Sequence, residues 1–268
     1  MSRNWLKLMM AAGLVGLGAC KENTSPVASL FNDSTVTADV AASSGDAMAT
    51  MVKGMGDNET SVGMAPGVES LGMAGLAADY SRSRTCYDST GAVVAGCSPL
   101  SSVRTIVTAA TLNTTRNDTA STLGGATITF NGGVHRAWND TLFRNFTAGS
   151  ETSRTHSGLQ TAFDTTSFQR AGVVDTVTRT HDEAATDSVR GVTWNLPRAS
   201  NPFPVSGYIV RIDTVHATFT NATTSVSRTE IKHIKITFPA DAQGNVVLTI
   251  DSKTCNLNLV TRRVTDCH

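Results

Sequence analysis

The sequence has no excess of charge of either sign, and its apolar runs are short. Lys+Arg and Asp+Glu both number 22, so the formal net charge of the 268 residues is zero. Binding to a nucleic-acid backbone needs clustered positive charge, so we expect no nucleic-acid partner. The apolar run 8–17 near the N-terminus has about ten residues, which reach only half way across a hydrocarbon core of roughly 30 Å. We therefore expect no membrane-spanning helix there.

The sequence also lacks the motifs of common catalytic families. It contains no Gly-x-Ser-x-Gly elbow, no His-Glu-x-x-His pair, no phosphate-binding glycine loop ahead of a helix and no Cys-x-x-Cys. These motifs would carry a serine nucleophile, a zinc site, a nucleotide site and a redox pair, respectively. Nothing here points to a particular reaction, and we expect neither a metal nor an organic cofactor.

The N-terminal segment has the composition of an export signal. Arg3 and Lys7 supply positive charge, and the apolar run 8–17 follows them. The segment ends in Leu17-Gly18-Ala19-Cys20, which resembles the lipobox of bacterial lipoproteins. An ordinary secretory signal with an incidental cysteine is the alternative interpretation.

The resemblance to bacterial lipoproteins implies an address for the mature chain. In that family a peptidase removes the signal, here 1–19, and the thiol of Cys20 carries covalent lipid, so the membrane is a partner through the anchor. The next residue is Lys21 rather than Asp, which favours the outer membrane in the best-known sorting system. We therefore expect a lipid-anchored protein of the bacterial cell envelope, on the periplasmic face or the cell surface, with 20–35 as a polar tether.

Four further cysteines are spaced for two local disulfides. An even number in an oxidising compartment indicates disulfide bonds, although four cysteines allow three pairings. Each close pair encloses a predicted hairpin, so we expect the bonds Cys86–Cys97 and Cys255–Cys267. A zinc site built from all four is the competing interpretation, but zinc ligands usually come in pairs about two to four residues apart.

One amphipathic helix is predicted near the start of the mature chain. Small and apolar residues recur at spacings of three and four between Asp39 and Met55, which places them on one helical face. A stretch rich in Met, Gly and Ala follows, in which no period persists. We therefore assign a helix and a loop to 36–78.

From residue 79 to 268 the sequence is typical of an antiparallel β domain. Turn signals recur at short intervals, as at Asn131-Gly132-Gly133, Asn139-Asp140 and Ala148-Gly149-Ser150. We predict a mainly β fold, an antiparallel meander that forms a curved sheet or open barrel, with the N-terminal amphipathic helix covering part of its apolar face. The candidate strands are 103–112, 126–130, 134–138, 141–147, 152–157, 159–164, 173–180, 187–194, 207–220, 225–238, 245–251 and 255–260.

Two of these strands, 207–220 and 225–238, change the parity of their apolar residues near the middle. In the first, Val210 and Ile212 share one parity, whereas Val215 and the apolar residues after it share the other. A β-bulge near Asp213, with a matching bulge in the partner strand, would bring all of them to one face. We therefore predict two bulged strands and a strongly curved sheet.

The densest titratable cluster is His181-Asp182-Glu183. An acid and a base side by side could transfer protons or bind a divalent cation, so the three residues form a candidate site. They stand between two predicted strands, and a solvated hairpin loop without function explains them equally simply.

Other histidines and two tryptophans are isolated along the chain. We expect His135, His156 and His233 at the surface or the rim of the sheet. Trp138 and Trp194 end predicted strands, where burial at the sheet margin is the usual role and stacking on a sugar ring is the alternative.

These observations predict an envelope-anchored lipoprotein that is structural or binds a partner, without catalysis. Its partner would be another envelope protein or a lipophilic ligand. One alternative is a carrier or sensor of a lipophilic molecule, held between a half-barrel and the helix. A second alternative is a hydrolase that uses His181 and its neighbouring carboxylates.

Overall fold

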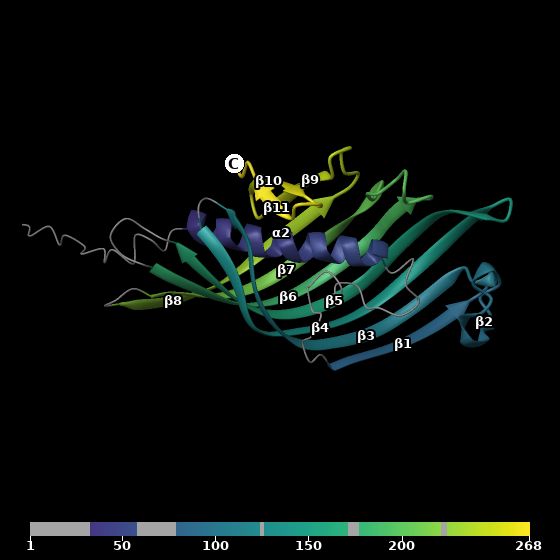
Figure 1. Cartoon of the computed structure of the whole chain (residues 1–268), viewed down its shortest axis with the longest axis horizontal. Helices are drawn as coiled ribbons and strands as arrows, with labels where there is room; N and C mark the ends of the chain where they lie inside the picture. Colours follow the sequence, from purple (N-terminus) through teal and green to yellow (C-terminus); the bar gives the residue numbers. More distant parts are fainter. Residues whose placement is uncertain (1–32, 58–78, 124–125, 171–176, 221–223) are drawn as a thin grey trace, which may run out of the picture.

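The computed structural model describes residues 33–57, 79–123, 126–170, 177–220 and 224–268. In this part of the chain one helix, α2 (Asp33–Asp57), lies on a single antiparallel sheet of eleven strands (Figure 1). The strands follow one another across the sheet in chain order, except that β2 lies outside β1. The two outermost strands, β2 and β11, do not pair with each other, so the sheet is open and curved. The predicted antiparallel meander with one N-terminal helix is confirmed.

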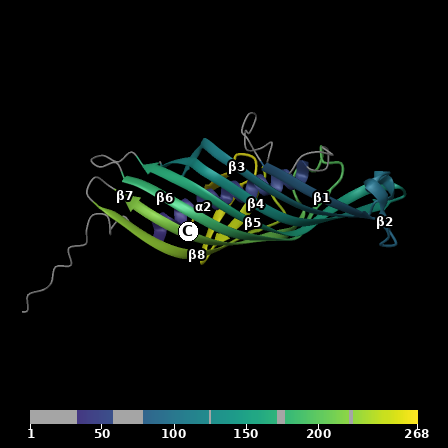
Figure 2. The same cartoon turned by 90° about the horizontal axis from the view of Figure 1, so that it is seen from below.

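The long strands form the body of the sheet, and the short ones lie at its two ends. Figure 2, seen from below, shows the long strands running side by side beneath α2. The strands are β1 (Asp79–Tyr87), β2 (Val93–Val94), β3 (Thr105–Leu123), β4 (Ala126–Thr147), β5 (Ser150–Arg170), β6 (Val177–Asn195), β7 (Ser206–Thr220), β8 (Ser225–Thr237), β9 (Asn245–Ile250), β10 (Lys253–Asn258) and β11 (Arg263–Thr265).

Several predicted strand ends are wrong, because the chain continues where a turn was expected. The three segments predicted between 126 and 147 form one strand, β4. Asn131-Gly132-Gly133 lies at a register shift against β5 rather than at a turn. The glycines therefore interrupt the pairing with β5 locally and do not end the strand. Asn139-Asp140 stays paired on both sides, with β3 and with β5. Only Ala148-Gly149 turns the chain, with positive φ values of 50° and 82°.

β5 and β6 were each divided in two by the sequence prediction. β5 is continuous past 158, with a register shift between His156 and Gly158, and β6 is continuous from 177 to 195. The predicted start of the β6 segment, 173–176, lies outside the described residues. Long uninterrupted strands accumulate the right-handed twist of a sheet, and here they bend it around α2.

The predicted bulges in β7 and β8 are wrong. The two strands pair in register from Tyr208–Thr237 to Thr220–Ser225 without a shift. Burial alternates regularly along β7, so Arg211 and Asp213 point into the concave side and Ile212 points outward. The change of parity therefore reflects charged side chains on the buried face rather than a bulge.

α2 lies between the main sheet and the C-terminal strands β9, β10 and β11, as Figure 1 shows. Val40, Met48 and Val52 join a buried cluster with residues of β6 to β11, among them Trp194 and Leu257. β11 contacts both α2 and β3, so the sheet curls most of the way around the helix. No helix in the described residues has the length and apolar character needed to cross a membrane.

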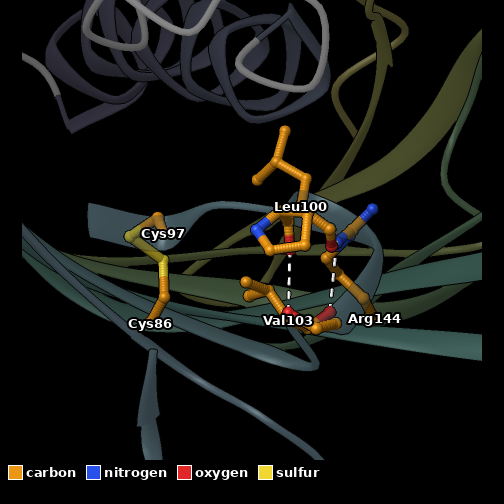
Figure 3. The surroundings of a disulfide bond; sticks show 7 residues. Cys86, Cys97, Leu100, Val103 and Arg144 are labelled. Carbon is orange, nitrogen blue, oxygen red and sulfur yellow. Dashed lines mark hydrogen bonds between the residues drawn. A yellow bond between two sulfur atoms is a disulfide. The ribbon is translucent and has the colours of Figure 1, made fainter. Parts of the chain in front are cut away.

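Two disulfides join the ends of the sheet to their neighbouring turns. Cys86 of β1 bonds to Cys97 in the 3-10 turn η1 (Ala95–Cys97), and Cys255 of β10 bonds to Cys267 beyond β11. Figure 3 shows the first of these bonds. Both predicted pairings are confirmed, and the zinc interpretation of the four cysteines is wrong because their sulfur atoms are in disulfide bonds.

Candidate functional site

The predicted cluster His181-Asp182-Glu183 lies within β6, not in a hairpin loop. Side chains alternate along a strand, so His181 and Glu183 point into the concave side while Asp182 points outward. His181 is completely buried and Glu183 is nearly so. The prediction of a solvated loop is wrong, because this polar segment pairs in register with β5 and β7.

The polar side chains of α2 meet those of β6 directly. Arg179 Nη2 donates to Asp39 Oδ1 over 2.8 Å, and Arg179 Nε forms an ion pair with Asp39 Oδ2 at 2.7 Å. Ser43 Oγ donates to Glu183 Oε1 over 2.7 Å. His181 stands between these two contacts, with Nε2 3.7 Å from Asp39 Oδ2 and Nδ1 4.0 Å from Glu183 Oε1. The predicted cluster is therefore one half of a helix–sheet contact.

A second group of charges lies on β6, β7 and β8 under the same helix. Ser44 Oγ donates to Asp213 Oδ2 over 3.2 Å. Arg211 Nε lies 3.7 Å from Asp187 Oδ1 and 3.8 Å from Asp213 Oδ2, and all three side chains are almost completely buried. On the next strand Lys232 Nζ donates to Thr37 Oγ1 of the helix over 3.3 Å.

Burial sets the charge state of His181. Loss of hydration disfavours an imidazolium, and the nearby Arg179 guanidinium adds repulsion. Together they lower the pKa of His181 to about 3. The ring is therefore neutral at ordinary pH, although two carboxylates lie close to it.

The arrangement on the concave face could hold a proton, but its polar side chains are buried. α2 covers the cluster, and the small hollow at the C-terminal end of the helix, beside Met51 and Met55, measures about 30 Å³. That volume is enough for about one water molecule. No group of His, Cys, Asp and Glu in the described residues could hold a metal ion.

Sequence reasoning missed a buried pair on β4 and β5. His156 Nδ1 lies 2.8 Å from Asp140 Oδ2, and the His156 ring meets Trp194 edge-on with centroids 5.5 Å apart. The prediction of His156 at the surface is wrong, since its ring is almost completely buried. The signal was hidden because Asp140 was assigned to a turn. His135 and His233 are exposed as predicted, and Trp138 and Trp194 are buried.

The outer face of β1, β3, β4 and β5 carries a hollow of about 430 Å³. Its outward-pointing lining consists of hydroxyl, amide and small apolar side chains, with the half-exposed Leu159 beside them. Uncharged groups such as these can contact a neutral polar surface. The residues concerned are Ser81, Ser83, Ala109, Thr111, Ala137, Asn139, Leu159 and Thr161.

At the end of the sheet near the first disulfide, Arg144 holds several segments together. Its guanidinium donates to the main-chain oxygens of Leu100 and Val103 (Figure 3) and makes a bidentate pair with Glu151. Arg154 binds the same carboxylate, and both arginines lower the pKa of Glu151 to about 2 even though burial opposes the shift. Every donor named here serves a structural contact.

The fold and this polar interior define the protein only as an open antiparallel sheet wrapped around a buried helix. No protein-family model, no curated protein and no solved structure matches the chain. The lipobox, Cys20 and the predicted tether up to residue 32 lie outside the described residues. The last three residues predicted as tether, 33–35, belong to α2 instead.

Proposed function

We propose that this chain is a lipoprotein of the bacterial cell envelope, anchored by lipid on Cys20, whose body binds a partner without catalysis. The anchor is supported by the positive N-terminal segment, the short apolar run and the lipobox-like Leu17-Gly18-Ala19-Cys20. Two disulfides agree with an oxidising compartment. Lys21 after the cysteine favours the outer membrane as the site of anchoring.

The observation that carries the non-catalytic part is the filling of the concave face by α2. A carrier would hold its ligand there, and a hydrolase would use His181 and Glu183 there. Both residues are covered, and the hollow beside Met51 and Met55 has room for about one water. The surface left for binding is therefore the part of the sheet that α2 does not cover.

The anchor is tested by the mass and the partitioning of the full chain after expression in a bacterium with a lipoprotein pathway. We expect the wild type to lose residues 1–19, to gain the mass of a diacylglyceryl group and to enter the detergent phase in a phase-separation assay. Cys20→Ser should show neither lipid mass nor partitioning. Cleavage elsewhere, with an unmodified Cys20, would exclude the anchor.

The closed concave face is tested by hydrogen exchange on the detergent-solubilised chain. We expect amides in the middle of α2 to exchange as slowly as those of the central strand β7, because both then exchange only by global unfolding. If α2 exchanges much faster than β7, the helix leaves the sheet in the native state. That result would contradict the proposal and would favour the carrier or the hydrolase.

A further inference from the structure

The concave side of the sheet carries arginines near the end of the sheet that β1 forms with β2. Arg82 pairs in register with Ala110 of β3, which pairs with Trp138 of β4. Ala110 and Trp138 are buried, so this row of side chains faces inward. Arg84 lies two residues further along the same face, and Arg136 precedes Trp138 by two on β4. Arg82 and Arg84 of β1 therefore share one face of the sheet with Arg136 of β4, and β3 lies between the two strands.

Two of these arginines have polar atoms that are shielded from water without an acceptor. Arg82 Nη2 and Arg84 Nε are buried and form no hydrogen bond with any described residue. A guanidinium N–H that loses water without gaining an acceptor costs free energy, and nearly all buried donors in native proteins are satisfied. These two atoms therefore point to a hydrogen-bond acceptor outside the described residues.

Carboxylates on the same side of the sheet are engaged with other groups. The row of Arg84 continues through Thr108 to Asp140, which binds His156. On the helix, Asp39 pairs with Arg179, and Asp46 lies 3.2 Å from Arg262. Ala110 and Thr108 of β3, which pair with Arg82 and Arg84, carry no charge. In the described part of the chain, these carboxylates are therefore paired away from Arg82 and Arg84.

The β1 edge also leaves a route for a ligand. β2 pairs with β1 only at Cys86 and Tyr87, so in the described residues no further strand lies beside the segment of β1 that contains Arg82 and Arg84. Both arginine side chains are half-buried rather than enclosed. The described part of the chain therefore leaves this edge open to a ligand.

We propose that Arg82 and Arg84 form a binding site for a phosphate group. Each planar guanidinium presents a fork of N–H donors that matches two phosphate oxygens, and several forks can share one dianion. The phosphate can belong to a free anion or to the headgroup of an anionic lipid, since the chemistry of recognition is the same. The site does not depend on the anchor at Cys20.

The test measures ligand binding to the full chain in a neutral detergent. One arm titrates inorganic phosphate, and the other adds phosphatidylglycerol or, as its neutral comparison, phosphatidylcholine to the micelles. We expect saturable binding in at least one arm, weakened about tenfold or more in the double variant Arg82→Gln/Arg84→Gln, since charge-assisted bonds are lost. Binding of phosphate alone identifies a soluble ligand, and preference for phosphatidylglycerol identifies a headgroup.

Two controls keep the test decisive. Arg190→Gln removes an exposed arginine of β6 and should bind like the wild type. Arg82→Lys/Arg84→Lys keeps the charge but loses the planar forks, so it should bind with intermediate affinity and should fold if the glutamine variant does not. Absence of binding in both arms, or equal binding by the wild type and the lysine and glutamine variants, would overturn the proposal.

Discussion

At the scale of single residues, the interior of this protein is unusually polar on one side of its helix. Arg179, Arg211 and Lys232 are buried on the sheet, and carboxylates of β6, β7 and α2 lie near them. A buried ion pair gives little net stability compared with an apolar pair, but removing one partner leaves a costly unpaired charge. These contacts therefore fix how α2 lies on the sheet more than how tightly it is held.

His181 gives this interior a dependence on pH. Its pKa is about 3 in the folded protein and about 6.5 in an unfolded chain, so the unfolded state binds a proton more readily. The contribution is neutral above pH 6.5, and stability falls as the pH drops from 6.5 towards 3. At pH 5 the loss from this residue is about 2 kcal/mol.

We predict that His181→Gln flattens this loss. Urea unfolding of the wild type at pH 7 and pH 5 should show a fall in the free energy of unfolding that is about 2 kcal/mol smaller in the variant. His216→Gln, at an exposed position of β7, should keep the wild-type dependence. An unchanged pH dependence in His181→Gln would show that the ring is already accessible to protons.

A second residue-scale prediction concerns the ion pair between α2 and β6. Arg179→Met should lower the free energy of unfolding by about 3–5 kcal/mol, because it leaves the buried Asp39 carboxylate without the guanidinium that it pairs with. Adding Asp39→Leu should restore part of that loss, and a double-mutant cycle measures the coupling. Strictly additive effects would mean that the two side chains do not interact in solution.

At the scale of elements, α2 lies so close to the C-terminal strands that one position has no room for a side chain. A Cβ on Gly45 would stand 2.4 Å from Val264 Cγ2 of β11 and 3.4 Å from Leu257 Cδ1 of β10. The stiff, β-branched Val264 cannot move aside easily. The glycine is needed here for close approach of two elements.

This contact reverses the usual effect of replacing a helical glycine. Gly→Ala in an open helix stabilises by about 0.5–1 kcal/mol, whereas we expect Gly45→Ala to destabilise by about 1–3 kcal/mol through overpacking. In a Val264→Ala background the same change should become neutral or stabilising. Thermal unfolding of the four proteins of this cycle measures both effects. A stabilising Gly45→Ala in the wild type would contradict the packing described here.

At the scale of the whole molecule, the two disulfides have different neighbours. Cys255 belongs to the large cluster that surrounds α2, whereas Cys86 belongs to a small separate cluster with Val103 and Ile106. The bonded cysteines are 12 residues apart in Cys255–Cys267 and 11 apart in Cys86–Cys97. Each bond therefore removes nearly the same conformational entropy from the unfolded chain. Their effects on the helix should nevertheless differ.

Removing either bond with paired Cys→Ser changes should cost about 3 kcal/mol in free energy of unfolding. Hydrogen exchange then separates the two. We expect Cys255→Ser/Cys267→Ser to speed exchange in α2 more than in β4, because β10 and β11 cover the helix. Cys86→Ser/Cys97→Ser should leave the ratio of the exchange rates in α2 and β4 unchanged. Equal ratios in both variants would mean that the C-terminal strands do not hold the helix down.

Much of the architecture follows from local pattern. The recurrence of small and apolar residues predicts α2, the mix of β-branched residues and turn formers predicts an antiparallel meander, and cysteine spacing predicts both disulfides. These properties depend on residues close together in the chain. The predicted turns at 131–133 and 139–140 failed because strand pairing outweighs the turn preference of Asn and Gly, with β3 at 131–133 and with both β3 and β5 at 139–140.

What the sequence could not determine is which side of each strand is buried. The polarity of Arg211, Asp213 and Glu183 predicts that they point outward, yet each is buried beneath α2. A charged side chain can be buried only where a partner from a distant segment meets it, as Ser44 meets Asp213 and Ser43 meets Glu183. The sequence by itself predicted the helix, the antiparallel meander and the disulfides, and the export signal with its lipobox stays a prediction. Only the tertiary structure decided the polar interior and the cluster of arginines, because both arise from side chains that the folded sheet brings together.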